Sequence, residues 1–286
     1  MMKSRGIRSE KMRKVYSETR EWLLNPPPPL LLFALLLVVA SANPADQTQA
    51  STLEFSYAGS HGPANWGSLN QQFSACMSGK TQSPVNIIRK EAVENKNLTP
   101  LTRDYIPANA TLLRYEGNPG ILIVDGKNYT LKEMHWHSPS EHQIDGIQFA
   151  AELHLVHRTD SGPLAVVSIL YELGDADPFV NKIKDKLDAL AKETCAGNEE
   201  AHIAVGVLDN KLLRKNTRKY YRYSGSFTSP PCSENVTWNI LGKVRTISKE
   251  QLESLRAPLG DDYKQNSRPV QSLNGRKIQL YNEFTD

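Results

Sequence analysis

The sequence predicts a mainly β fold, built on one large, mostly antiparallel sheet with short peripheral helices. Short runs rich in β-branched and aromatic residues recur along the chain, and turn residues separate several of them. Helical periodicity, in contrast, is confined to two stretches. The runs of strand length are residues 121–124, 129–137, 149–157, 164–170, 203–208, 220–223 and 236–244.

Turn chemistry links some of these runs. Asp125-Gly126 lies between the first two, and an Asp-Gly pair favours the positive φ angles of a tight hairpin turn. A second turn around Asp145-Gly146 predicts that residues 129–137 and 149–157 pair in antiparallel fashion.

Two helices are expected at the edge of this sheet. Asp177-Pro178 can cap and begin the first helix, because proline fits the first helical position. Ser248 and Gln251 form a capping box that predicts the second helix. The apolar positions on one face of each helix are Phe179, Ile183, Leu187 and Leu190 in the first, and Leu252 and Leu255 in the second.

Residues 1–42 have the features of a cleaved secretory signal peptide. The first 21 residues hold seven basic and three acidic side chains, an apolar run follows at residues 30–40, and Ala40-Ser41-Ala42 matches a small-residue cleavage site. The apolar run is too short to span a bilayer comfortably, so a signal anchor is the less favoured alternative.

The rest of the chain predicts a flexible tail at residues 43–54 and a single domain at residues 55–286. The whole chain has a formal net charge of +3, and the leader accounts for +4, which leaves the mature part close to −1. A domain with so little net charge gives no indication of nucleic-acid binding. We also expect no stable membrane span in the mature chain.

The chemistry of the chain centres on histidines in two of the predicted strands. His135 and His137 leave the same strand face together with Glu133, since side chains alternate with period two. The expected antiparallel pairing brings His154 beside them, with Glu152 on its own strand face. Three neutral imidazoles at one point are the ligand set of a catalytic zinc ion with an open fourth position. The two glutamates stand where acceptors for the second ring nitrogens belong.

Cysteines and glycosylation sequons agree with passage through the secretory pathway. An odd count of three cysteines (Cys76, Cys195 and Cys232) suggests one bridge and one free thiol, and spacing alone cannot choose the pair. Four Asn-x-Thr sequons are present, and the one at Asn235, which leads straight into a strand, is expected to stay unmodified. The candidates for glycosylation are Asn97, Asn109 and Asn128.

Several motifs together resemble the α-class carbonic anhydrases, and in particular their plant members. The resemblance covers about residues 55–283. The motifs that carry it are Gly62-Pro63-Ala64-Asn65-Trp66-Gly67, Gln82-Ser83-Pro84-Val85-Asn86-Ile87, residues 135–142, residues 150–157, residues 223–232 and Asn266-Ser267-Arg268-Pro269. The fold implied is that of the α-carbonic anhydrases, and the reaction implied is zinc-dependent reversible hydration of carbon dioxide to bicarbonate and a proton.

Carried over position by position, the resemblance makes His135, His137 and His154 the ligands of Zn²⁺. It makes Thr228 the residue that orients the metal-bound hydroxide, and Glu141 the carboxylate that accepts the proton of that threonine. The side chains that match the substrate pocket are Val156, Val166, Phe227, Ser229, Val236 and Trp238.

The resemblance also implies a Cys76–Cys232 bridge, with Cys195 free on the loop after the first helix. Sulfonamides and small anions are implied as inhibitors at the zinc. We expect a monomer or a weak dimer.

Two departures from the family pattern matter. The acceptor behind the first zinc ligand is usually an amide, and here it is Glu133. Residues 114–120 directly bridge a segment where relatives carry a further strand and the histidine that shuttles protons. We therefore expect slowed turnover with zinc binding intact.

Three functional classes stay open at this point. The first is an active hydratase. The second is a weak or inactive carbonic-anhydrase-like protein kept for storage or binding, and the third, a copper or redox protein, lacks soft ligands at suitable positions. Beyond entry into the ER, the expected destination is the cell wall or the chloroplast stroma reached through the secretory route.

Overall fold

The structure, a computed structural model, describes residues 55–111, 114–115, 119–195, 204–214 and 217–284. All of them belong to one compact unit, residues 37–286. The predicted signal peptide and tail, residues 1–54, lie outside the described residues. Within the described ranges, no helix is long and apolar enough to cross a membrane.

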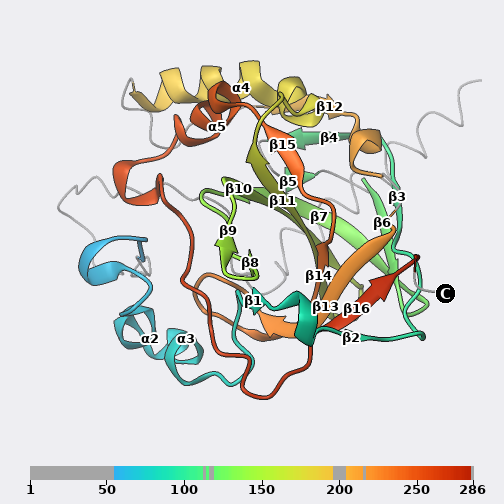
Figure 1. The fold of residues 1–286 in the computed structure, drawn as a ribbon. Coiled ribbons are helices and arrows are strands. Elements are labelled where there is room, and N and C mark those ends of the chain that lie inside the picture. The colour runs from blue at the N-terminus through green and yellow to red at the C-terminus, as the bar shows by residue number, and fades with distance from the viewer. Residues whose placement is uncertain (1–54, 112–113, 116–118, 196–203, 215–216, 285–286) are drawn as a thin grey trace, which may run out of the picture. The chain divides into compact units, whose positions relative to one another are not determined.

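A 13-stranded sheet forms the body of the fold (Figure 1). Ten strands follow one another in the order β12-β4-β5-β7-β10-β11-β14-β13-β16-β2, while β3 pairs with β6, β6 with β7, and β15 with β11. The strand bounds are β2 Val93–Glu94, β3 Thr102–Tyr105, β4 Ala108–Thr111, β5 Arg114–Tyr115, β6 Gly120–Val124, β7 Lys127–His137, β10 Ala151–Arg158, β11 Leu164–Leu173, β12 Ala204–Leu208, β13 Lys219–Ser226, β14 Glu234–Leu241, β15 Arg245–Ile247 and β16 Gln279–Asn282.

Smaller elements surround this sheet. A second sheet has the strand order β1-β8-β9, and its last two strands form a hairpin between β7 and β10. The bounds are β1 Asn86–Ile87, β8 Gln143–Ile144 and β9 Ile147–Gln148 for the strands, α2 Trp66–Leu69, α3 Ala75–Ser78, α4 Pro178–Cys195 and α5 Lys249–Arg256 for the α-helices, and η1 Gly59–His61, η2 Gln71–Phe73, η3 Arg89–Glu91, η4 Asn210–Leu213 and η5 Asp261–Tyr263 for the 3₁₀ turns.

Most strand pairs are antiparallel, as predicted, but the sheet is mixed. Strand β11 runs parallel to β14 and to β15, and β16 runs parallel to β2. Parallel neighbours require a long crossover, and β11 reaches β14 only through α4, β12 and β13. Such distant pairings leave no local signal in the sequence.

The seven predicted strand runs all form strands, with shifted ends. The last run ends at Leu241, and residues 242–244 lead from β14 into β15. Residues 145–146 turn with φ angles of 50° and 79°, as expected for the hairpin between β8 and β9. The segment 114–120 is more than a direct bridge, since Arg114–Tyr115 form β5 and pair with β4 and β7. Residues 116–118 and 203 lie outside the described residues.

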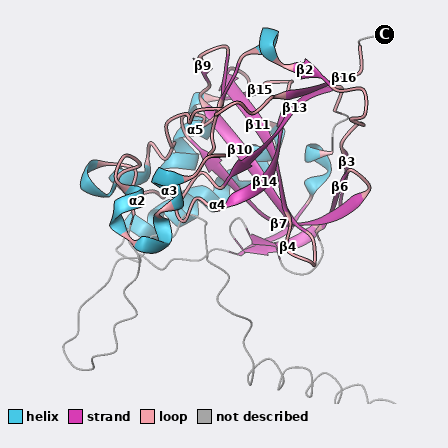
Figure 2. Ribbon diagram, turned by 90° about the horizontal axis from the view of Figure 1, so that it is seen from below, coloured by secondary structure: helices cyan, strands magenta, loops and turns pink. Residues whose placement is uncertain are grey.

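Both predicted helices are present and capped as expected. The N–H groups of Phe179 and Val180 donate to Asp177 Oδ1 at 2.7 and 3.1 Å, and Ser248 and Gln251 form the reciprocal capping box of α5. Both helices lie against the same side of the large sheet (Figure 2). Cys195 is the exposed last residue of α4, so its predicted place on the following loop is wrong.

Strand β10 lies between β7 and β11, and its side chains are buried on both faces. Leu153 and Leu155 point into the core that α4 covers, which also contains Phe179 and Ile183. His154 and Val156 point to the opposite face, because side chains alternate along a strand. The fold thereby places the imidazole of His154 in the middle of the sheet.

The Cys76–Cys232 disulfide implied by the resemblance is present. It joins α3 to the loop between β13 and β14, across a sequence separation of 156 residues. Both cysteines are buried with Trp66 and Phe73 in a small apolar cluster. The bridge fixes the end of the loop that carries Thr228.

His157 is a fully buried histidine on β10 that lies away from the triad. Its Nδ1 donates to the Ala165 carbonyl at 3.2 Å, and its Nε2 accepts from the Tyr105 hydroxyl at 2.8 Å. Burial lowers the pKa of His157 from 6.5 to about 3. Between these two values the unfolded chain binds more protons than the folded one, so acid must weaken the fold.

We expect the free energy of unfolding to decline between pH 7 and pH 5, and His157→Gln to remove about 2 kcal/mol of that decline. Urea unfolding at both pH values measures it. His61→Gln, at an exposed imidazole, is the matched control and should leave the decline unchanged. If the free energy of unfolding declined equally in the wild type and in His157→Gln, the lowered pKa of His157 would be contradicted.

Candidate metal centre

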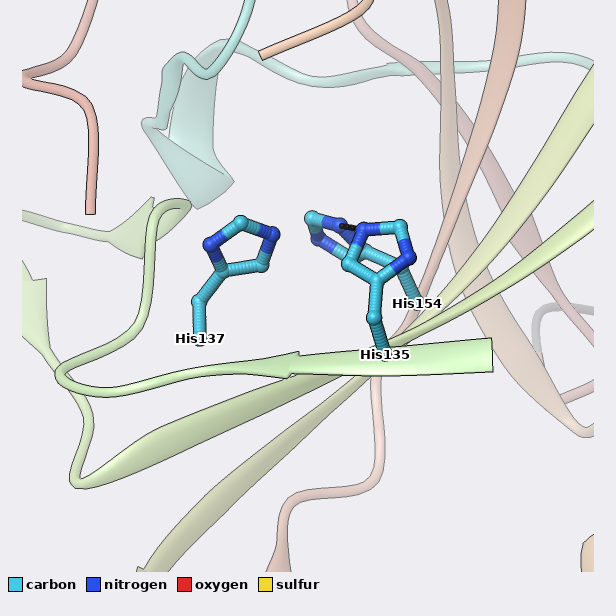
Figure 3. Close-up of side chains that lie close together, drawn as sticks. All are labelled: His135, His137 and His154. Atoms are coloured by element: carbon cyan, nitrogen blue, oxygen red, sulfur yellow. Dashed lines mark hydrogen bonds between the residues drawn. The ribbon is translucent and has the colours of Figure 1, made fainter. Parts of the chain in front are cut away.

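Three histidine rings converge on one face of the large sheet. His135 and His137 lie on β7, and His154 on β10 stands directly opposite His135 in the antiparallel register. The ring centroids of His137 lie 5.1 Å from His135 and 4.6 Å from His154, and those of His135 and His154 are 5.1 Å apart. Figure 3 shows one nitrogen of each ring turned toward a common point.

The outer nitrogens of His137 and His154 donate hydrogen bonds, whereas that of His135 has no hydrogen-bond partner among the described residues. His137 Nδ1 donates to the Asn266 carbonyl at 2.6 Å, and His154 Nε2 donates to Glu152 Oε1 at 2.8 Å. His135 Nδ1 has a longer contact, 3.5 Å from Glu133 Oε1. Both predicted glutamates therefore lie behind the rings, and the Asn266 carbonyl completes the set.

The inner nitrogens are left with unshared electron pairs. Because His154 Nε2 carries its proton toward Glu152, the neutral ring presents a bare Nδ1, which lies 3.3 Å from His135 Nε2. His137 Nε2 is buried and has no hydrogen-bond partner among the described residues. Burial also lowers the pKa of His154 to about 4 and that of His137 well below 6.5, which keeps both rings neutral at pH 7. This donor set suits a divalent cation.

Glu152 joins these rings to the protein behind them. Besides His154 Nε2, its carboxylate accepts from His142 Nδ1 at 2.6 Å, from the Ser168 hydroxyl, and from the N–H groups of residues 141 and 142 at 2.8 Å. Burial raises the pKa of Glu152, but the two imidazoles and their hydrogen bonds outweigh it and hold the pKa well below 4.5. His142, Glu152 and His154 also cluster. These three residues are already hydrogen-bonded to one another, so His142 and Glu152 hold the ring of His154 in place.

Thr228 and Glu141 lie within reach of each other. Both are buried, and the side chain of Thr228 interacts with the Glu141 carboxyl. Burial and then the charge of Glu152 hold the pKa of Glu141 well above 4.5, and hydrogen bonds from the Arg268 N–H, at 3.0 Å, and from Thr228 offset this rise only in part. A cation at the triad would favour the ionised form of Glu141.

Arg268 anchors the segment on which Glu141 depends. Its guanidinium donates to the carbonyls of Cys76 and Ser83 at 2.7 and 2.8 Å and to Gln82 Oε1 at 2.9 Å. Its N–H holds Glu141, so one residue ties the carboxyl to the disulfide-bonded part of the chain. The sequence offered Arg268 only as part of a motif. Its role was missed, as was that of Asn266, which acts through a backbone carbonyl.

The residues predicted for an apolar wall lie together beside the triad. Val156, Val166, Val236 and Trp238 are buried in one cluster, and Phe227 packs against it. The Trp238 and His154 rings have centroids 4.8 Å apart, which places the wall next to the metal-binding face. Ser229 lies one residue beyond Thr228, half-buried, and its carbonyl accepts from the Cys232 N–H at 2.9 Å.

The other predicted sites are partly described. Asn97 and Asn128 are exposed, and Asn109 lies on β4 with its side chain outside the described residues. His142 and His157 are buried, His61 is exposed on η1, and His202 lies outside the described residues. Among the described residues, the histidines of this centre are the three of the triad and His142, which bonds to Glu152.

Comparisons with known proteins agree with this geometry. The family model of the eukaryotic-type carbonic anhydrases matches residues 61–282. Alpha carbonic anhydrase 7 of Arabidopsis thaliana is 41% identical over 228 residues, which are 77% of this chain and 81% of the relative.

Two solved structures share the fold. One is dioscorin complexed with ascorbate, with a TM-score of 0.77 and 34% identity over 82% of this chain and 100% of the other. The second is the α-carbonic anhydrase of Thermovibrio ammonificans with the inhibitor sulfanilamide, with a TM-score of 0.71 and 33% identity over 79% and 99% of the two chains. Since the family model covers most of its length and its relatives are plant α carbonic anhydrases, this chain belongs to the eukaryotic-type carbonic anhydrase family, in its plant α class.

Proposed function

We propose that this protein is a zinc enzyme that reversibly hydrates carbon dioxide to bicarbonate and a proton. The observation that carries the proposal is the convergence of three imidazoles, two of which, His137 and His154, donate hydrogen bonds from their outer nitrogens. Membership of the family supports the same reaction.

The residues present fit a zinc ion. His135, His137 and His154 would hold it, and the buried, unpartnered Nε2 of His137 is explained if it faces a cation. A zinc ion held by three histidines supplies a hydroxide nucleophile near neutral pH, because it lowers the pKa of water to about 7.

The surrounding side chains orient the reactants. The Thr228 hydroxyl can donate to only one acceptor, and Glu141 takes that hydrogen, so the oxygen of Thr228 is left to accept one from the nucleophile. Val156, Val166 and Trp238 form a wall without charges, suited to an uncharged substrate such as carbon dioxide. The wall also keeps water away from the reacting carbon.

Thr228→Ala should lower kcat/KM for carbon dioxide hydration by roughly 100-fold, because it removes this orientation. Stopped-flow hydration assays of the zinc-loaded protein measure the change, with sulfanilamide as the inhibitor control. Thr246→Ala, on β15, is the matched substitution outside the centre and should keep wild-type activity. Equal activity of both variants would contradict the proposal.

Proton release is expected to limit turnover. None of the histidines in the described residues is placed as a relay, and a proton leaves slowly near neutral pH without a group of matched pKa. We therefore expect kcat to rise severalfold with added imidazole at constant pH and ionic strength. A buffer that does not titrate near neutral pH, varied over the same range, is the control. A high kcat that does not change with the imidazole concentration would show that proton release does not limit turnover.

Glu152→Gln should weaken zinc binding by about 10–100-fold, since it removes the carboxylate that orients His154. Competition with a chromophoric chelator measures the affinity without reference to catalysis. Glu133→Gln is the comparison, and its effect should be smaller because Glu133 lies 3.5 Å from His135 Nδ1. Near-ultraviolet circular dichroism confirms that both variants stay folded. An unchanged zinc affinity in Glu152→Gln would show that the carboxylate does not support the ligand.

A second candidate function is that of a carbonic-anhydrase-like storage or binding protein with little or no activity. The missing shuttle histidine and the similarity to dioscorin, solved in complex with ascorbate, favour it. Metal analysis with the hydration assay separates the two functions. Stoichiometric zinc with inhibitor-sensitive hydration supports the enzyme, whereas ascorbate binding without hydration supports the alternative.

The remaining expectations belong to the same proposal. We infer that sulfonamides and small anions bind at the zinc, an inference supported by the complex of the Thermovibrio ammonificans α-carbonic anhydrase with the inhibitor sulfanilamide. The protein is proposed to enter the secretory pathway and to act in the cell wall or, through the ER, in the chloroplast stroma. It is proposed to be a monomer or a weak dimer, with Asn97, Asn109 and Asn128 as candidate glycan acceptors.

A further inference from the structure

A cavity whose lining contains none of the histidines lies along β13, β14 and the chain that leads into β16. It has a volume of about 710 Å³, within the usual range for sites that bind small molecules. Tyr223 and Trp238 contact the rings of His142 and His154, so Arg222, Ser224 and Thr237, their neighbours in sequence, point to the opposite face. These three residues line the cavity together with residues of the loop after β2 and the chain that leads into β16.

The lining carries more positive than negative charge. Arg222, Arg276 and Lys277 face a single carboxylate, Asp125. Arg222 Nη1 donates to Asp125 Oδ1 at 2.7 Å, so the charges of these two side chains neutralise each other. Arg276 and Lys277 have no carboxylate within ion-pair distance among the described residues. Glu234 nonetheless acts on Arg276 electrostatically, so Lys277 carries the positive charge that is left for a ligand.

Arg276 is held rigidly. Its guanidinium donates to the carbonyls of Gln82, Ser224, Ser272 and Leu273 at 2.7 to 2.9 Å and lies over the ring of Tyr223. Carbonyl oxygens satisfy its hydrogens but do not cancel its charge. The charge is fixed in place before any anion arrives, which lowers the entropic cost of binding.

The rest of the lining is suited to hydroxyl groups. The hydroxyls of Ser224 and Thr237 and the side-chain amide of Asn97 have no hydrogen-bond partners among the described residues. Asn95 Nδ2 donates to Gln279 Oε1 at 3.1 Å and Asn95 Oδ1 accepts from the Asn97 N–H at 2.9 Å, which leaves the Nε2 of Gln279 open. Amide and hydroxyl groups around a positive charge match a ligand with several hydroxyls and one acidic group.

We propose that this pocket binds a hydroxylated carboxylate of the size of an acidic sugar, such as a uronate. The carboxylate pairs with Lys277 Nζ in the field of Arg276, and the sugar hydroxyls bond to Ser224 and Thr237. None of these residues belongs to the metal centre, so the proposal does not depend on the reaction proposed above.

The test is a calorimetric titration of the zinc-loaded protein with D-galacturonate, neutral D-galactose and sulfate. We expect galacturonate to bind at least tenfold more tightly than galactose or sulfate. Lys277→Gln should weaken galacturonate binding by about 5–10-fold, since a charge-assisted hydrogen bond is lost. Lys186→Gln, at an exposed lysine of α4, makes the same charge change and should have no effect.

A second variant tests the hydroxyl contacts. Ser224→Ala should weaken galacturonate binding and leave the binding of sulfate unchanged, because sulfate has no hydroxyl to place there. The side chains of Lys277 and Ser224 are both exposed, so Lys277→Gln and Ser224→Ala should stay folded. The proposal is overturned if galacturonate fails to bind, if sulfate binds as tightly, or if Lys277→Gln leaves its affinity unchanged, which would place the anion elsewhere, including at the metal.

Discussion

The antiparallel register between β7 and β10 is the constraint on which the centre depends. His154 stands opposite His135, and Glu152 stands opposite His137, so one alignment brings the third ring to the first two and places its acceptor behind it. Side chains alternate with period two, and a slip of one residue would turn His154 and Val156 into the core under α4 and bring leucines to the centre. The buried leucines of β10 oppose such a slip, because they would lose their apolar surroundings.

The buried carboxylate of Glu152 stabilises this arrangement of the histidine rings through hydrogen bonds. Glu152 is removed from water, which by itself would favour its neutral form, yet two imidazoles, a hydroxyl and two N–H groups surround it. A charge that is fully bonded in this way has a fixed position. The ring of His154 consequently has one tautomer and one orientation, and its free nitrogen points toward His135 Nε2.

Much of the fold and of the centre follows from local sequence patterns. Alternation and the Asp145-Gly146 turn suffice to predict that β7 and β10 pair and that three histidines meet, and capping residues predict both long helices. The resemblance supplies Thr228, Glu141 and the choice of disulfide partners, which spacing could not decide. Other features are not local. The parallel contact between β11 and β14 joins strands separated by a helix and two further strands.

The part played by Asn266 is hidden for a different reason. It acts through its backbone carbonyl, which every residue possesses, so its residue type gives no signal. The Arg268 N–H is concealed in the same way.

The origin of these two groups has a consequence for shortened forms of the protein. The three rings come from one short stretch of chain, whereas the carbonyl behind His137 and the N–H that holds Glu141 arrive about 130 residues later. A product that ends before residue 266, whether from alternative splicing or proteolysis, would retain every imidazole. It would lack the backbone groups that orient His137 and Glu141, so an intact ligand motif in a transcript does not guarantee a competent catalyst.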